Sequence, residues 1–175
     1  LDLISQAEHS SDTFCYLITN SEKIAKLVND IISKLLPTIQ RRNLVKSSLS
    51  KNGFIAVCKN NSDMINLANS LAPEHLQIMT KNPKSISSKI TTSGLVLLGN
   101  YSPSSASDYI LGSNHILPTN GFGKIRGSLS VMDFIKINTE VLASKSSLSK
   151  ISKHLDTLTT SEGLPNHYEA VRGRL

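Results

Sequence analysis

Short apolar runs alternate with amphipathic stretches along the first two-thirds of the chain. The runs read as strands buried on both faces, and the stretches between them place apolar residues at helical spacing. Strands that alternate with helices in this way form a parallel sheet with crossover helices. Ser21 is expected to cap one helix, and Asn61 or Ser62 another. The expected strands are 14–19, 53–59, 76–80 and 95–98, and the expected helices are 1–9, 21–36, 37–50, 61–71 and 82–90.

The composition changes near residue 144, where Ser and Lys become frequent. Four apolar residues from Leu148 to Leu158 form a narrow helical stripe, and a last helix is expected to start near Ser161. A strand-like piece is expected at 135–137. Two helices with so little apolar surface are not expected to fold alone, so they should dock on the main domain or on another subunit.

The predicted fold class is therefore α/β, an incomplete Rossmann-like parallel sheet with crossover helices followed by a C-terminal helical tail. The boundaries are expected to be 1–127 for the α/β part and 128–175 for the tail, which we expect to dock in a dimer. The first residues, LDLISQAEH, contain no Met and read like the end of a helix. We therefore expect a fragment, and a catalytically silent piece that at most binds metal or associates stays open as an alternative.

Composition excludes some classes of function. The chain has 175 residues, with 39% hydrophobic and 18% charged residues and a net charge of +6, which fits an ordinary globular protein. The basic residues are scattered and Trp is absent, so a solvated basic surface is favoured over nucleic-acid binding. Cys15 and Cys58 lie in apolar runs and indicate buried thiols in a reducing compartment. With no apolar run near ~20 residues and no visible signal peptide, we expect a cytoplasmic protein without a membrane partner.

Candidate chemistry gathers around the polar segment that follows the strand 95–98. This segment carries Asp108, on a short helix expected to begin at Ser102-Pro103, and His115. Active groups of α/β proteins collect beyond the carboxyl ends of the strands, so we expect the site there. The segment GFGKIRG at 121–127 lacks the spacing of a phosphate-binding loop, and that reading is rejected.

Other polar groups lie far away along the chain. Gln6 and His9 are three residues apart and share a helix face, and Glu74 and His75 form an adjacent pair after a proline. Imidazole, carboxylate and amide oxygen donors suit a divalent ion such as zinc, and the lack of thiolate ligands excludes a zinc finger. Taken singly, each of these groups is explained more simply by a solvated surface. The candidate donors are Gln6, His9, Asp108 and His167, and the further polar groups are Glu74, His75, His115 and Glu162.

Five segments of the chain carry a resemblance to a known family. They are SQAEH (5–9), LAPEHLQI (71–78), GLVLLGNYSPSSASDYILGSNHILPT (94–119), SLSVMDFIK (128–136) and SEGLPNHYEAVR (161–172). In this order they resemble the C-terminal portion of histidinol dehydrogenase. That family oxidises L-histidinol to L-histidinaldehyde and then to L-histidine, the last steps of histidine biosynthesis, and reduces two NAD⁺ in succession.

The resemblance implies a role for each of these residues. His75 is expected to be the general base that takes the alcohol proton, and Glu74 to activate the water that attacks the aldehyde. The family is a homodimer whose tail, here with Glu162 and His167, reaches into the partner's site. The NAD contacts are expected upstream of this chain, and Lys124 and Arg126 have no assigned role. The expected zinc ligands, with manganese as the alternative metal, are Gln6, His9, Asp108 and His167; these four, together with His75, His115 and Glu162, are expected to contact the substrate.

Overall fold

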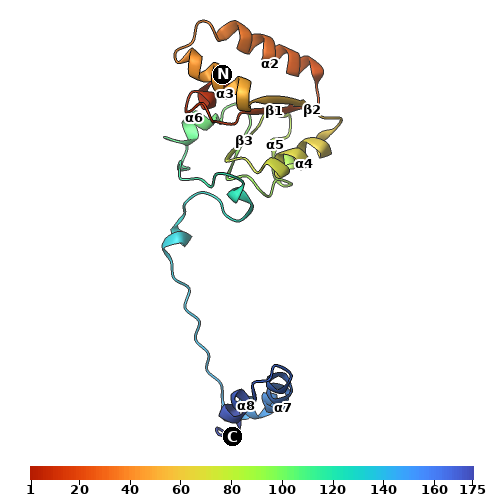
Figure 1. Cartoon of the computed structure of the whole chain (residues 1–175), viewed down its shortest axis with the longest axis vertical. Coiled ribbons are helices and arrows are strands. Elements are labelled where there is room, and N and C mark those ends of the chain that lie inside the picture. Colours follow the sequence, from red (N-terminus) through yellow and green to blue (C-terminus); the bar gives the residue numbers. More distant parts are fainter. The chain divides into compact units, whose positions relative to one another are not determined.

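The computed structural model describes all residues, Leu1–Leu175, and they fall into two compact units, Leu1–Asp133 and Phe134–Leu175 (Figure 1). The predicted boundary, between residues 127 and 128, lies a few residues before the observed boundary between Asp133 and Phe134. The first unit contains all four strands, and the second contains the two C-terminal helices. This agrees with the expected order of an α/β part followed by a helical tail.

The strands of the first unit form two parallel pairs. Strand β1 (Tyr16–Thr19) pairs with β2 (Phe54–Val57), and β3 (His75–Ile78) pairs with β4 (Leu95–Leu98). Helices connect the members of each pair, so the prediction of an α/β fold with parallel strands and crossover helices is confirmed. The strands do not form one continuous sheet, because no pairing joins β1 to β3. The crossover helices are α2 (Glu22–Leu35) and α3 (Arg42–Asn52) in the first pair and α5 (Pro83–Ser87) in the second.

Side-chain caps explain where two of the helices begin. The Ser21 hydroxyl accepts a hydrogen bond from the Ile24 N–H at 3.3 Å and starts α2, as predicted. Helix α4 (Asn61–Leu71) is capped by Asn60, whose Oδ1 accepts from the Asp63 N–H at 2.9 Å. The prediction of Asn61 or Ser62 as this cap is therefore wrong by a residue or two.

Three further predictions differ from the structure. The helix predicted over 37–50 begins only at Arg42, because turns follow Pro37 and Arg41 adopts a left-handed conformation with φ +52°. The last helix begins at Pro165, since Gly163, with φ +72°, ends the preceding turn. The strand-like piece at 135–137 is absent, and all three of its residues are exposed, so no neighbouring strand buries its apolar side.

The core of the first unit is small. Helix α1 (Asp2–Ala7) packs against α3 and against the short α6 (Ser104–Ser107). Helix α2 packs on β1 and β2, yet none of its residues is buried. Its apolar residues Ile24, Leu27 and Ile31 are exposed. The buried residues of this core are Ile4, Ala7, Cys15 and Val45, and the partly buried residues around them are Leu3, Leu35, Leu36, Ile39 and Leu49.

The second unit consists of two helices that pack against each other, α7 (Lys145–Ser161) and α8 (Pro165–Arg172). The Ser144 hydroxyl caps α7 by accepting from the Ser147 N–H at 3.0 Å. Neither helix contains a buried residue, which agrees with the small apolar surface expected of the tail. Its docking on the main domain or a second subunit stays a prediction. No helix in either unit combines the length and apolar character needed to cross a membrane.

Candidate active site

Two of the predicted site residues meet directly. The Nε2 atom of His75 lies 3.3 Å from Oδ1 of Asp108, and each side chain is only 16% exposed. His75 is the first residue of β3, and Asp108 ends the short helix α6. The structure therefore holds an imidazole and a carboxylate in a partly desolvated contact, a pair suited to moving a proton.

The pair lies at the amino-terminal end of its sheet. His75 opens β3 and is in register with Leu95, the first residue of β4. The chain leaves β4 at Leu98 and then returns, so that Asp108 contacts the start of β3. The prediction that the site lies beyond the carboxyl ends of the strands is therefore wrong for this pair, because the loop after β4 is long enough to run back.

Gln6 reaches the same region from α1. Its Nε2 donates to the Ser104 hydroxyl at 3.0 Å, and Ser104 is only 4% exposed. This bond uses the amide nitrogen of Gln6. The amide oxygen of Gln6 is left to accept a hydrogen bond or to coordinate a cation. Sequence reasoning missed Ser104. The available signal was its place directly after Pro103, at the start of a short helix.

A cleft of about 880 Å³ is lined by His75, Gln6 and Ser104, whereas Asp108 is not among its lining residues. Gln6, Glu74, His75 and Ser104 line its polar part, and Glu74 is half-buried there. The rest of the lining is mostly apolar, and its helix and strand residues come from α1, β1, α2, α4 and β3. Such a cleft, apolar with a few convergent polar groups, is typical of a small-molecule site. It places an amide, a carboxylate and an imidazole around one space.

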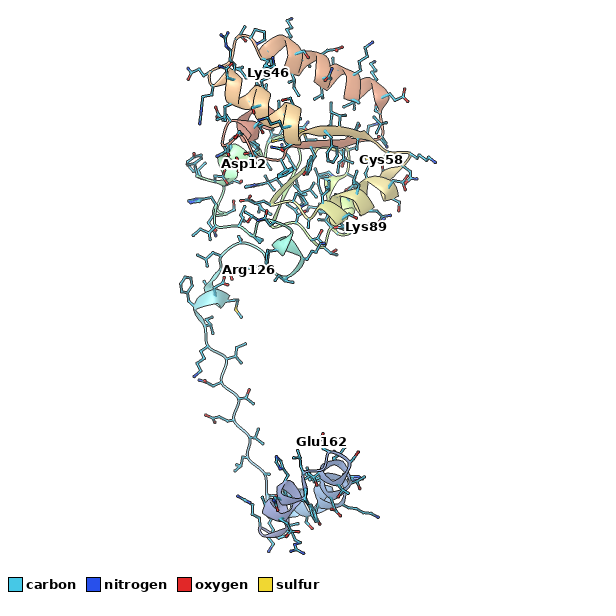
Figure 2. The ribbon with its side chains drawn as sticks, in the orientation of Figure 1. Asp12, Lys46, Cys58, Lys89, Arg126 and Glu162 are labelled. Atoms are coloured by element: carbon cyan, nitrogen blue, oxygen red, sulfur yellow. The ribbon has the colours of Figure 1, made fainter.

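None of the other predicted residues has a side chain that is hydrogen-bonded to this group. His9 is exposed just after α1, and its backbone N–H donates to the Gln6 carbonyl at 3.2 Å. His115 is exposed in the loop after α6. Glu162, labelled in Figure 2, and His167 are exposed residues of the second unit. No three His, Cys, Asp or Glu side chains lie together as a metal site, so the predicted zinc ligand set stays a prediction.

One glycine of the GFGKIRG segment, Gly123, is closely packed. Gly123 lies in the turn η1 (Phe122–Lys124), and a Cβ there would come within 2.2 Å of the Thr92 carbonyl oxygen. At Gly94, a Cβ would lie 2.8 Å from the Glu74 carbonyl oxygen and 3.0 Å from Pro118. The turn is thus pressed against the segment that leads into β4. This gives Gly123 a steric role, whereas a Cβ at Gly121 or Gly127 would meet no atom closer than 3.6 Å.

Arg126, labelled in Figure 2, forms an ion pair with Asp133 at 2.9 Å. The backbone N–H of Ser130 donates to the other oxygen of Asp133 at 2.7 Å and is the main cause of a lowered pKa of that carboxyl group, to which Arg126 adds. Both side chains are partly exposed, so the pair contributes little to stability. Its role is local, within the last turns of the first unit. Nothing in the structure explains Lys124.

Comparisons with known proteins agree on one family. The family model described as histidinol dehydrogenase matches residues 1–175. The histidinol dehydrogenase of Oceanobacillus iheyensis is 39% identical over 173 residues, which cover 99% of this chain and 40% of that protein. That of Methanopyrus kandleri is 38% identical over 174 residues, with the same coverage of 99% and 40%.

A solved structure gives the same result. The crystal structure of histidinol dehydrogenase from Elizabethkingia anophelis matches with a TM-score of 0.89 and 34% identity, covering 99% of this chain and 40% of that one. The chain thus spans about 40% of the length of the relatives that it matches. Because the family model spans every residue and the fold agrees with a solved member, the chain belongs to the histidinol dehydrogenase family.

Proposed function

We propose that residues 1–175 supply a substrate half-site for the NAD-dependent oxidation of L-histidinol to L-histidine by way of L-histidinaldehyde. The observation that carries the proposal is the contact of Asp108 with His75, which lines the cleft beside Glu74. The relatives of this chain are named histidinol dehydrogenase. The chain spans 40% of those relatives, so the activity is assigned to a complete enzyme. By complete enzyme we mean residues 1–175 joined to the remaining length that the relatives have.

In the first oxidation, His75 takes the proton of the substrate hydroxyl. A neutral imidazole accepts a proton readily at neutral pH. With Nε2 turned toward Asp108 at 3.3 Å, Nδ1 is the ring nitrogen left to accept that proton. The Asp108 carboxylate holds the ring in place and stabilises the positive charge that forms on it. A hydride leaves the carbon that bears this hydroxyl and is transferred to NAD⁺. We expect the residues that bind NAD⁺ to lie outside this chain.

In the second oxidation, Glu74 takes a proton from the water that attacks the aldehyde carbonyl. The position of Glu74 supports this role, because Glu74 directly precedes His75 and lines the same cleft. The half-buried position limits the access of bulk water, so an attacking water can be held between Glu74 and the carbonyl carbon. A second hydride then leaves the hydrated aldehyde for NAD⁺, and the carboxylate of histidine results.

The proposal includes zinc, with manganese as the alternative metal, held by Gln6, His9, Asp108 and His167. The donor chemistry supports it, since the Gln6 amide oxygen makes no hydrogen bond and Oδ2 of Asp108 is also unpaired. Their helices, α1 and α6, pack against each other. When bound, zinc would act as a Lewis acid on the alcohol and carbonyl oxygens and orient the substrate.

The proposal also includes a homodimer in the cytoplasm, with His115 and Glu162 holding the substrate and the tail serving the partner's site. Support for the dimer comes from the second unit, where Ile151 and Leu158 are 49% and 60% exposed and no residue is buried. Apolar surface of this kind favours a protein partner. The two cysteines are unpaired thiols, which favours a reducing compartment.

The test compares the complete enzyme with residues 1–175 alone, with L-histidinol, NAD⁺ and zinc supplied to both. The complete enzyme should form two NADH for each L-histidinol and release L-histidine. Residues 1–175 alone should form none, because they span only 40% of the relatives. A complete enzyme that forms no NADH, or stops at one NADH with aldehyde as the product, contradicts the proposal; no NADH at all would favour the catalytically silent alternative.

A further inference from the structure

The chain contains two Asn-Gly pairs, Asn52-Gly53 and Asn120-Gly121. In such a pair the backbone nitrogen of the glycine can attack the side-chain amide carbon of the asparagine, because glycine has no Cβ to shield its nitrogen. The two pairs have the same chemistry, so a difference in their reactivity must come from the fold. The structure gives the two pairs very different surroundings.

The pair Asn52-Gly53 is held by hydrogen bonds at the end of α3. The Asn52 side-chain nitrogen donates to the Ser11 carbonyl at 2.9 Å, and the Gly53 N–H, which would have to attack, donates to the Leu49 carbonyl at 3.2 Å. Gly53 is also crowded, since a Cβ there would come within 2.5 Å of the Leu49 carbonyl oxygen. Both reacting groups of this pair are restrained, so the end of the helix must open locally before they can react.

The pair Asn120-Gly121 forms the centre of a tight turn. The Phe122 N–H donates to the Thr119 carbonyl at 3.0 Å across the turn, and Asn120 and Gly121 have positive φ angles of +51° and +79°. Asn-Gly is favoured in such turns because both central residues need positive φ.

Nothing holds the reacting groups of this second pair. The Gly121 N–H donates no backbone hydrogen bond, and the exposed Asn120 side chain makes none. The space around Gly121 is open, because a Cβ built there would meet no atom within 4 Å. The amide carbon of Asn120 and the nitrogen of Gly121 can therefore approach each other without loss of a bond that either group makes.

We propose that Asn120 is a site of spontaneous deamidation at the lining of the candidate active-site cleft. The Gly121 nitrogen bonds to Cγ of Asn120 while the bond from Cγ to Nδ2 breaks, and the proton of the Gly121 nitrogen leaves with Nδ2 as ammonia. Water then opens the resulting succinimide ring at either of its carbonyls, which leaves an aspartate or an isoaspartate. Water is the only co-reactant.

The position of Asn120 gives the modification a consequence for the cleft. Thr119, Asn120 and Gly121 line the cleft together with Glu74 and His75. Either product adds a negative charge to this lining, and isoaspartate also lengthens the main chain of the turn by a methylene group. The reaction needs only the groups of the turn, so it proceeds whatever ligand the cleft binds.

The test ages the complete enzyme in mildly alkaline buffer and follows both pairs by peptide mapping with mass spectrometry. We expect Asn120 to lose its amide at least about tenfold faster than Asn52, because only Asn52 needs local opening first. Equal rates, or faster loss at Asn52, would overturn the proposal. So would an Asn120 that keeps its amide in the folded enzyme while it loses it in the unfolded chain.

The same enzyme unfolded in guanidinium chloride is the control for intrinsic reactivity. Without the fold, the two pairs should react within about threefold of each other, because neither keeps its hydrogen bonds in the denatured ensemble. If Asn120 still reacted about tenfold faster than Asn52 after unfolding, sequence neighbours and not the fold would set the rates, which would contradict the proposal.

Two matched variants test the attacking nitrogen. Asn120→Gln keeps the side-chain amide but moves its carbon one bond farther from the Gly121 nitrogen, so amide loss at this position should fall at least about tenfold. Asn52→Gln should leave the rate at Asn120 unchanged. If Asn120→Gln lost its amide as fast as the unmodified enzyme, water would remove the amide directly and the proposed attack by Gly121 would be wrong.

Discussion

His75 and Asp108 stand 33 positions apart in the sequence, and their side chains meet at 3.3 Å. This contact ties the start of β3 to the end of α6. The bond between Gln6 and Ser104, 98 positions apart, ties α6 in turn to α1. Three distant segments are thereby fixed around one cleft. Substitutions in any of the three should therefore affect the same site.

Metal binding is predicted to depend on both units of the chain. Asp108→Ala removes a carboxylate and His167→Ala an imidazole from the proposed ligand set, so each should lower the zinc content of the complete enzyme. Elemental analysis after dialysis measures this content. Asp133→Ala is the matched control, because Asp133 pairs with Arg126 away from the proposed set, and it should retain zinc. Full zinc occupancy in both ligand variants would contradict the ligand assignment.

Removal of the Ser104 hydroxyl is predicted to loosen Gln6. Ser104→Ala leaves the Gln6 Nε2 without its acceptor and should lower the free energy of unfolding by about 0.5–1.5 kcal/mol. Chemical denaturation measures the change. Ser105→Ala, at the exposed neighbouring position, should have almost no effect. If the two variants had the same free energy of unfolding, the bond between Ser104 and Gln6 would make no contribution to stability.

A methyl group at Gly123 is predicted to disturb the turn beside β4. The Cβ in Gly123→Ala would lie 2.2 Å from the Thr92 carbonyl oxygen, so backbone must move, at a cost of about 1–3 kcal/mol in the free energy of unfolding. Gly127→Ala is the control, because its Cβ would come no closer than 3.6 Å to a neighbouring atom. Thermal or urea unfolding compares the two, and equal stability would show that the turn is not tightly packed.

The thiol of Cys15 is predicted to resist alkylation. Burial raises its pKa from 9.0 to about 11, because the thiolate is poorly solvated there. Iodoacetamide at pH 8 should therefore modify the half-buried Cys58 first and Cys15 only upon unfolding, as mass spectrometry can follow. Since the folded pKa exceeds the unfolded one, this thiol favours the folded state fully below pH 9, and its contribution falls as the pH rises toward 11. Fast modification of Cys15 in the folded protein would contradict its burial.

Local patterns in the sequence predict much of the fold. Ser21, Asn82 and Ser144 each start a helix near the expected place, because capping depends on neighbouring residues only. The continuous apolar run at 95–98 forms β4, where it pairs with β3. The piece at 135–137, with isoleucines at both ends, stays exposed without strand structure, since a strand needs a partner that the sequence alone does not reveal.

The site depends on contacts that local patterns do not contain. The sequence singles out His75 and Asp108 as candidates, but not their contact at the amino end of β3. Ser104 escapes prediction because its bond to Gln6 spans 98 positions. The separation into two strand pairs is equally hidden, since strand pairing depends on contacts between distant segments and not on either strand alone.

The turnover number of His75→Ala in the complete enzyme, measured as histidinol-dependent NADH formation at saturating substrate, tests the central assignment most directly. Loss of a general base lowers a rate by about 10²- to 10⁴-fold, and we expect a loss of that size with zinc still bound. Turnover within a few-fold of the unmodified enzyme would show that His75 is not the group that takes the alcohol proton.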